Sequence, residues 1–165
     1  PAIKTFLSEA REFSPSREFF GYQKDRREGV LQQIKAIYET LKGKGVSYVS
    51  TSLDFSGHQS IKLPSQTLAD NFGNCADSSV LFAGICEAIK INPIIIVIPW
   101  KHMFFGFEAS RGGGDYFFLE TTCVGNYSFE EAIKEGREKF KANRGNLKII
   151  DITKAREAGI FPIML

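Results

Sequence analysis

The sequence predicts an α+β domain that combines a buried helix with a β-hairpin and a further strand. Residues 75–90 carry apolar or small side chains around most of a helical circumference, so we expect a central, buried helix there. Residues 94–98 form a β-branched run between two prolines, which is typical of a strand buried on both faces. Residues 102–109 and 115–121 flank a glycine-rich turn and predict a hairpin.

The remaining segments predict peripheral helices and short extended pieces. Helices are expected at residues 3–13, 24–41, 65–72, 129–141 and 151–158, and extended pieces at 46–55 and 147–150. The chain has 165 residues, of which 43% are hydrophobic, and it shows no repeat or linker. We therefore expect a single domain over residues 1–165, with N-terminal helices at 1–45 and a core at 46–165.

The charge and hydropathy patterns argue against two classes of partner. The 21 basic and 19 acidic residues are scattered rather than clustered, so we expect no nucleic-acid partner. The longest apolar run, residues 91–100, includes Asn92 and two prolines and is too short for a membrane span. The chain begins at Pro1 without a signal-peptide pattern, which indicates a processed or excised piece and leaves its compartment open.

Cys75 is the most informative of the three cysteines. They are spaced 11 and 37 residues apart without a C-x-x-C pair, which is not the pattern of a disulfide framework. Asn74 is a typical helix N-cap and places Cys75 in the first turn of the predicted helix. Unpaired N–H groups and the helix dipole at such a position favour a thiolate. Cys75 is therefore a candidate nucleophile, whereas we expect Cys86 and Cys123 to be buried small side chains.

A candidate base and acid follow on the predicted hairpin. The chain has two histidines, His58 and His102, and His102 begins the first hairpin strand. If the strands pair symmetrically about the glycine-rich turn, His102 lies opposite Thr122 and Phe104 lies opposite Glu120. His102 and Glu120 are then diagonal neighbours on one face, about 7 Å apart at the backbone, which allows an imidazole–carboxylate hydrogen bond.

A thiol, an imidazole and a carboxylate are the groups that nucleophilic acyl transfer requires. The thiolate attacks a carbonyl carbon, His102 protonates the leaving amine, and Glu120 orients the imidazole and stabilises its charged form. The backbone N–H of Cys75 is one candidate donor to the developing oxyanion.

The order of these residues resembles the transglutaminase-like superfamily, in which a G-x-C-x-D helix start, a strand histidine and a D-x-T or E-x-T acid follow one another. The matching stretches are residues 59–64, 73–77, 91–93, 101–106 and 119–122, with further similarity at 151–152, 155–156 and 159–160. The sequence is most similar to the bacterial branch that carries Glu in the acid position. The resemblance covers about residue 22 to the end of the chain.

This resemblance implies a papain-like fold, in which a core helix with the nucleophile packs on an antiparallel sheet. It also implies cysteine protease, amidase or transglutaminase chemistry on a peptide or protein amide, without a tightly bound cofactor. Carried over residue by residue, the triad is Cys75, His102 and Glu120, and residues 46–165 are the catalytic core. Lys101 departs from the pattern, because many relatives have Gly before the histidine, and a bulky cation there would alter access.

Two further side chains are candidates for the site. The amide of Gln59 is a candidate second oxyanion donor, and Trp100, next to His102, is a candidate wall of the substrate groove. A metal site would need ligands from scattered segments without short paired spacing, so we expect no metal.

The sequence leaves three functional readings open. The first is a peptidase or amidase, with water as acceptor of the acyl group. Transglutamination differs only in using an amine acceptor. The third is a catalytically silent module that binds a peptide or a partner domain, which Lys101 and the lack of an obvious second oxyanion donor favour.

Overall fold

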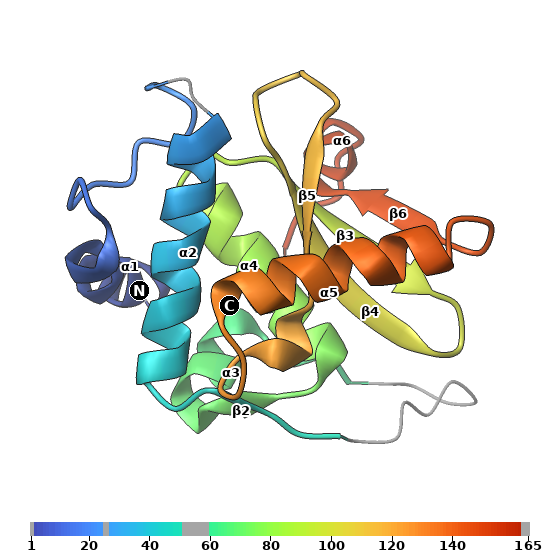
Figure 1. Ribbon diagram of the computed structural model, residues 1–165, viewed down its shortest axis with the longest axis horizontal. Helices are drawn as coiled ribbons and strands as arrows, with labels where there is room; N and C mark the ends of the chain where they lie inside the picture. Colours follow the sequence, from blue (N-terminus) through green and yellow to red (C-terminus); the bar gives the residue numbers. More distant parts are fainter. Residues whose placement is uncertain (1, 25–26, 51–59, 163–165) are drawn as a thin grey trace.

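The computed structural model describes residues 2–24, 27–50 and 60–162, which fold into a mixed arrangement of helices and sheets (Figure 1). The helices are α1 Ala2–Ala10, η1 Arg11–Phe13, α2 Arg27–Gly43, α3 Pro64–Asp70, α4 Cys75–Ala88, η2 Thr121–Cys123, α5 Phe129–Ala142 and α6 Ile152–Glu157. The strands are β1 Ser47–Tyr48, β2 Phe72–Gly73, β3 Pro93–Ile98, β4 His102–Glu108, β5 Tyr116–Leu119 and β6 Lys148–Asp151. The predicted α+β class is confirmed.

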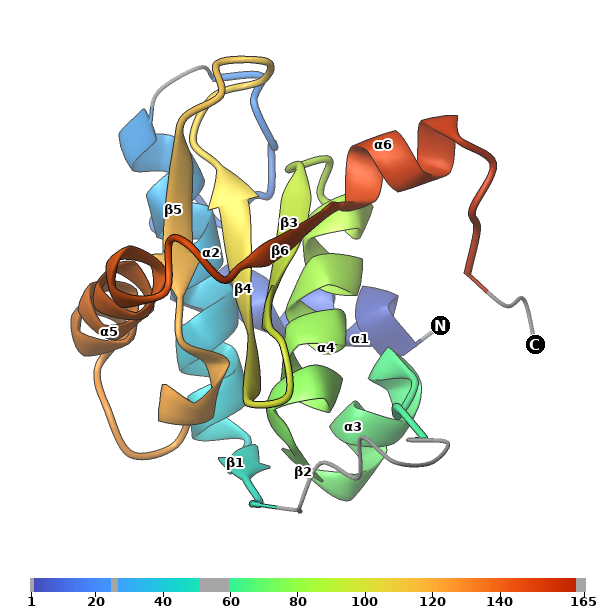
Figure 2. The same cartoon turned by 90° about the vertical axis from the view of Figure 1, so that its right-hand side faces the viewer.

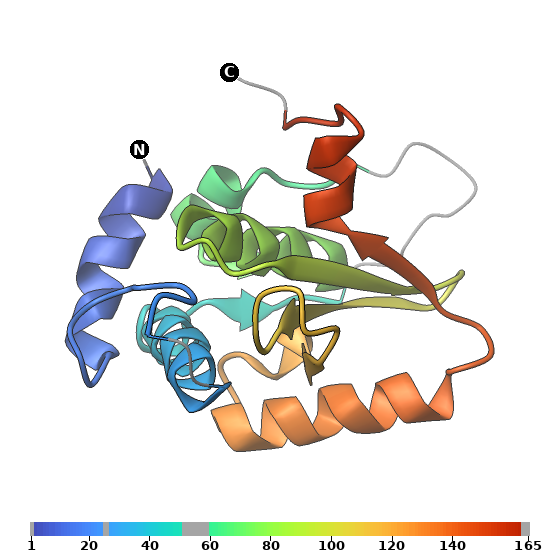
Figure 3. The ribbon, with the colours of Figure 1, turned by 90° about the horizontal axis from the view of Figure 1, so that it is seen from above.

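The main sheet lies between two helices. Its four strands are antiparallel and run in the order β5-β4-β3-β6. Helix α4 covers one face, and α5 lies along the other face over β5 (Figures 2 and 3). Helix α2 packs against both α1 and α5. Within the described ranges, every helix is too short or too polar to cross a bilayer.

Helix α4 owes its start and its burial to the sequence around it. The Asn74 side chain accepts hydrogen bonds from two backbone N–H groups of the first turn. The Asp77 side chain in turn accepts a hydrogen bond from the Asn74 N–H, which completes a capping box. The helix then packs its apolar side chains on β3 and β4, where Phe82 stacks on Phe105 with 5.5 Å between ring centroids. It ends at Ala88, two residues before the predicted end.

The predicted hairpin register is confirmed along the strands. Phe105 pairs with Leu119 and Glu108 with Tyr116, as symmetric pairing about the glycine-rich turn requires. Every residue of β4 from Phe104 to Glu108 is buried. One face of the strand packs on α4, and the other packs on a cluster that includes Phe118 of β5 and Phe140 of α5.

Pairing beyond Leu119 was predicted incorrectly. Phe104 does not pair with Glu120, nor His102 with Thr122, because the chain leaves the sheet and enters η2. The Glu120 N–H donates to the Ala132 carbonyl of α5 at 3.0 Å instead of to β4. The expected imidazole–carboxylate contact nevertheless forms, with Glu120 Oε2 at 2.7 Å from His102 Nε2.

Two short elements near the start of α4 also differ from the prediction. The helix expected at 65–72 ends at Asp70, because Asn71 adopts a left-handed conformation and the next two residues form β2. Strand β2 pairs in parallel with β1, the only described part of the predicted extended piece 46–55 that forms a strand. Residues 51–55 of that piece lie outside the described residues.

Helix α5 approaches β5 unusually closely at Gly136. A Cβ atom at this position would lie 2.6 Å from the Phe118 carbonyl carbon and 2.7 Å from the Leu119 nitrogen. One turn further along the helix, Phe140 stacks on Phe118 with ring centroids 3.9 Å apart. The missing side chain at Gly136 therefore allows the helix to lie directly on the strand backbone.

We predict that Gly136→Ala destabilises the protein. Alanine gains about 1 kcal/mol of helix propensity, but the new methyl group meets backbone that cannot move aside, and overpacking costs about 1–3 kcal/mol. Because the clashing atoms are backbone, the upper end of this overpacking range applies, and a net loss of about 2 kcal/mol is expected in urea unfolding. Gly145→Ala is the matched control, because a Cβ there meets nothing within 4 Å. An unchanged midpoint for Gly136→Ala would contradict the close approach.

Candidate active site

Cys75 occupies the first turn of α4, as predicted. The N-cap uses the N–H groups of Ala76 and Asp77, and the Cys75 N–H takes no part in it. The Cys75 carbonyl accepts a hydrogen bond of 2.6 Å from Ser79 Oγ. Cys75 is only 3% exposed, so its thiol lies in a largely water-excluded position at the positive end of the helix dipole.

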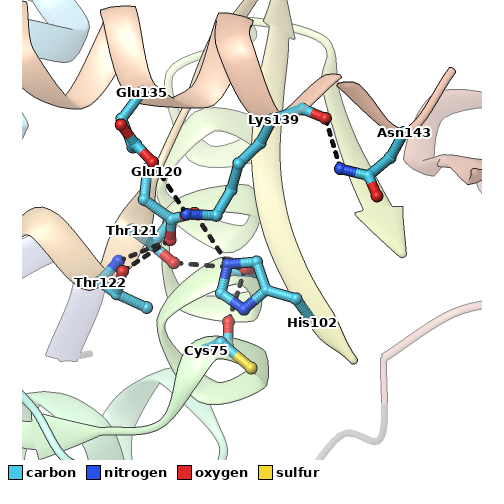
Figure 4. A network of polar contacts seen from close by, with 9 residues as sticks. Cys75, His102, Glu120, Thr121, Thr122, Glu135, Lys139 and Asn143 are labelled. Atoms are coloured by element: carbon cyan, nitrogen blue, oxygen red, sulfur yellow. Dashed lines mark hydrogen bonds and ion pairs between the residues drawn. The ribbon is translucent and has the colours of Figure 1, made fainter. Parts of the chain in front are cut away.

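His102 lies between Cys75 and Glu120. It is the first residue of β4, and its Nε2 is 2.7 Å from Glu120 Oε2. The other ring nitrogen, Nδ1, points toward Cys75 (Figure 4). The structure therefore brings together the three predicted residues from a helix, a strand and the end of the neighbouring strand.

The environment of His102 favours the charged imidazolium. Burial of the ring opposes a charge, but hydrogen bonding to the Cys75 and Glu120 side chains and the charge on Glu120 raise the pKa of His102 to about 9. The ring is therefore protonated at neutral pH, which is unusual for histidine.

Glu120 is a buried carboxylate whose two oxygens are both engaged. It is 1% exposed, and its Oε1 accepts hydrogen bonds from Thr122 N at 3.0 Å and Thr122 Oγ1 at 2.9 Å. Its Oε2 faces His102 and also lies 3.3 Å from Lys139 Nζ. Burial would raise the pKa of Glu120, but these partners outweigh burial and hold that pKa below its ordinary value.

The sequence prediction missed the groups around Glu120. Thr122 is within the E-x-T pattern, so its position was a usable signal, but its two hydrogen bonds to Glu120 were not inferred. Lys139 gives no such signal, because it pairs with Glu135 at 3.1 Å as an ordinary i,i+4 pair on a helix surface. Its contact with Glu120 depends on how α5 docks.

A hydroxyl contact links the nucleophile helix to the segment that carries the acid. Ser79 Oγ lies 3.5 Å from Thr121 Oγ1, and both side chains are buried. The first residue of η2 is therefore fixed against α4 directly below the triad.

The other two cysteines have environments that suppress reactivity. Cys86 is fully buried, and burial raises the pKa of its thiol well above the ordinary value. Burial and the nearby Glu120 raise the pKa of Cys123 to about 11. Both are thiols at neutral pH, as the prediction of inert, buried side chains implies.

The structure describes some, but not all, of the other side chains that the sequence indicates near the site. Trp100 is 70% exposed in the turn between β3 and β4, two residues before His102. Gln59 and His58 lie outside the described residues. Asp77 accepts from the Asn74 and Lys62 N–H groups, so its role is to hold the start of α4.

A metal centre finds no support in the part of the chain that the structure describes. No group of three or more His, Cys, Asp or Glu side chains there is arranged to hold an ion. The acidic and imidazole groups of the candidate site are engaged with one another and with Lys139.

Comparison with known proteins does not assign the chain to a family. No protein-family model matches the chain, and no curated protein matches it. The interpretation of the site therefore depends on the geometry of the residues themselves.

We predict that His102 titrates near pH 9 and that Glu120→Gln lowers its pKa. The neutral amide removes the charge that stabilises the imidazolium. Because the folded pKa is raised above 6.5, the associated stability is fully present below about pH 6.5 and is lost as the pH rises through 9. NMR titration of the imidazole checks both values, with a His58→Ala variant to assign the signals. An unchanged His102 pKa in Glu120→Gln would contradict the ion pair.

Proposed function

We propose that the protein is a cysteine-dependent acyl-transfer enzyme that cleaves an amide bond through a thioester, acting as a peptidase or amidase. The observation that carries this proposal is the placement of His102, whose Nε2 contacts the buried Glu120 carboxylate at 2.7 Å while Nδ1 points toward Cys75 (Figure 4). A thiol, a base and an orienting acid in this order are the groups that such chemistry uses.

In the first half of the reaction, Cys75 Sγ attacks the amide carbonyl carbon. A carbon–sulfur bond forms, and the carbonyl electrons move to oxygen to give an oxyanion. The Cys75 N–H at the helix start is placed to donate to that oxyanion. The carbon–nitrogen bond then breaks, and the leaving nitrogen takes a proton from the His102 imidazolium.

In the second half, neutral His102 takes a proton from water, and the resulting hydroxide attacks the thioester. The carbon–sulfur bond breaks, the carboxylic acid leaves, and Cys75 is released as a thiolate beside the His102 imidazolium, which is the starting state of the pair. Glu120 remains ionised throughout, because its partners hold its pKa below the ordinary value. Its role is to fix the imidazole orientation and stabilise the imidazolium.

The architecture supports a transglutaminase-like, papain-like core. The helix that carries Cys75 begins at the nucleophile and packs on an antiparallel sheet that carries His102. Glu120 stands in the position that the bacterial branch of that superfamily fills with glutamate. Its carboxylate reaches His102 from the point where the chain leaves the sheet.

The two alternatives lead to distinct outcomes. A transglutaminase would pass the acyl group to a primary amine, so incubation with a glutamine peptide and a labelled amine separates it from a hydrolase. A catalytically silent module would have no need of a protonated imidazole beside the thiol. The orientation of the His102 ring, with one nitrogen on Glu120 and the other directed toward Cys75, therefore favours an enzyme over a silent module.

We predict that iodoacetamide at neutral pH modifies Cys75 at least about tenfold faster than Cys86 or Cys123. The latter two are held as thiols, whereas Cys75 is paired with a protonated imidazole. Mass spectrometry of tryptic peptides measures the three rates. Cys75→Ala should abolish hydrolysis of a peptide library, and Cys123→Ala serves as the control. Equal alkylation rates, or hydrolysis that survives Cys75→Ala, would refute the proposal.

We propose that Trp100, a candidate wall of the substrate groove, contacts the substrate. The Lys101 N–H donates to the Ile98 carbonyl at 3.1 Å, and Trp100 has φ 64° in this turn. Such a position favours Gly, and a bulky residue there costs about 1–2 kcal/mol. A large, exposed indole is therefore held in an unfavourable backbone conformation two residues before His102, which supports our proposal that it contacts the substrate.

We predict that Trp100→Gly leaves stability unchanged or raises it by up to about 1 kcal/mol, because it relieves the unfavourable φ at some entropic cost. It should also lower kcat/KM for peptides with an apolar side chain by about tenfold, the loss expected for one apolar contact. Lys90→Gly is the control, since Lys90 also has a positive φ, 62°, away from the site. Loss of stability together with unchanged activity would rule out this role.

A further inference from the structure

Lys139 is the one charged side chain outside the triad that contacts the triad acid among the described residues. Its Nζ lies 3.3 Å from Glu120 Oε2 and 3.1 Å from Glu135 Oε1. Its side chain is 32% exposed, so the ammonium group reaches inward from the surface of α5 to a carboxylate that is 1% exposed. Figure 4 shows it reaching from α5 to the Glu120 carboxylate.

The docking of α5 makes this contact possible. At Gly136 the helix lies against the backbone of β5, and Lys139 is one turn further along the same helix. The Ala132 carbonyl of α5 accepts the Glu120 N–H at 3.0 Å. Helix α5 therefore holds Glu120 both by its backbone and by its side chain.

The two oxygens of Glu120 are occupied by donors of different kinds. Oε1 takes the backbone and hydroxyl donors of Thr122. Oε2 is shared by the imidazole of His102 and the ammonium group of Lys139. A carboxylate has about four acceptor sites, so rotation of Glu120 would break bonds to more than one partner.

We propose that Lys139 is a positioning residue of the site, which anchors Glu120 Oε2 and limits the negative charge that Glu120 presents to His102. By sharing the oxygen, the ammonium group weakens the attraction between carboxylate and imidazolium. It thereby allows His102 to release its proton to the leaving group. The catalytic meaning of this contact rests on the proposed function, but its electrostatic effect on His102 does not.

Several charged and titratable groups surround the Lys139 ammonium group, and burial and charge have opposite effects on its pKa. Glu135 lies beside it on α5, Glu120 and Cys123 face it from the end of β5 and from η2, and His102 lies across Glu120. Burial lowers the pKa of Lys139, but Glu120 and Glu135 raise it above the ordinary value. Lys139 therefore keeps its charge over the pH range in which His102 titrates.

The test is the His102 titration in Lys139→Met, measured by NMR. Removal of the ammonium group should raise the pKa of His102 above that of the wild type, because Glu120 then acts on the imidazolium without competition. Lys139→Arg retains the charge and should keep the wild-type pKa. Lys141→Met is the matched control: it removes a charge from the same helix, at a side chain that is 61% exposed and pairs with Glu138.

Hydrolysis gives a second measurement. Lys139→Met should lower kcat by roughly tenfold with little change in KM, because the loss is one of orientation rather than of substrate contact. Lys139→Arg should restore most of it. A folded Lys139→Met with an unchanged or lowered His102 pKa overturns the proposal. If Lys139→Met does not fold, Lys139→Gln is titrated instead, with the same expected rise and the same overturning result.

Failure of this proposal and failure of the proposed function give different results. If wild-type Cys75 shows no selective alkylation but the pKa of His102 rises in Lys139→Met, the enzyme proposal fails and the electrostatic role of Lys139 stands. If Cys75 is selectively alkylated but the pKa of His102 is the same in the wild type and in Lys139→Met, the proposed role of Lys139 is wrong and the enzyme proposal stands.

Discussion

The burial of the Glu120 carboxylate is the constraint on which the site depends. An ionised group that is 1% exposed loses its hydration, and such a loss costs several kcal/mol unless partners replace the water. Glu120 recovers that cost through Thr122, His102 and Lys139. Those partners belong to η2, β4 and α5, so satisfying one carboxylate fixes three elements relative to one another.

A second buried carboxylate has partners of a different kind from those of Glu120. Glu108, at the other end of β4, is 4% exposed and accepts from Asn92 Nδ2 at 2.7 Å and Gly114 N at 3.1 Å. Both donors are neutral, and neither can release a proton near neutral pH. Glu108 therefore stabilises the turn beyond β4, whereas Glu120, with a titratable imidazole as its partner, stabilises a protonation state.

The sequence was sufficient for most of the fold, because local signals and the hydrophobic pattern agreed. The cap at Asn74, the β-branched run of β3 and the glycine-rich turn each fix an element from a few residues, and the hairpin register followed from the turn. The error lay at Glu120, where α5 takes the backbone N–H that the strand would otherwise use. That competition is tertiary, so strand periodicity could not reveal it.

The proximity of Cys75, His102 and Glu120 could be predicted from local signals, whereas the contact of Lys139 with Glu120 could not. Cys75, His102 and Glu120 each stand at the end of a local element, where chain order and register restrict their positions. Lys139 reaches Glu120 because Gly136 lets α5 lie on the backbone of β5. From the sequence alone, a glycine within a helix indicates only a low helix propensity. In the folded protein that glycine allows the close approach. The packing of α5 and the charge balance around His102 are therefore linked, since a shift of the helix would move both the carbonyl and the ammonium group that hold the acid.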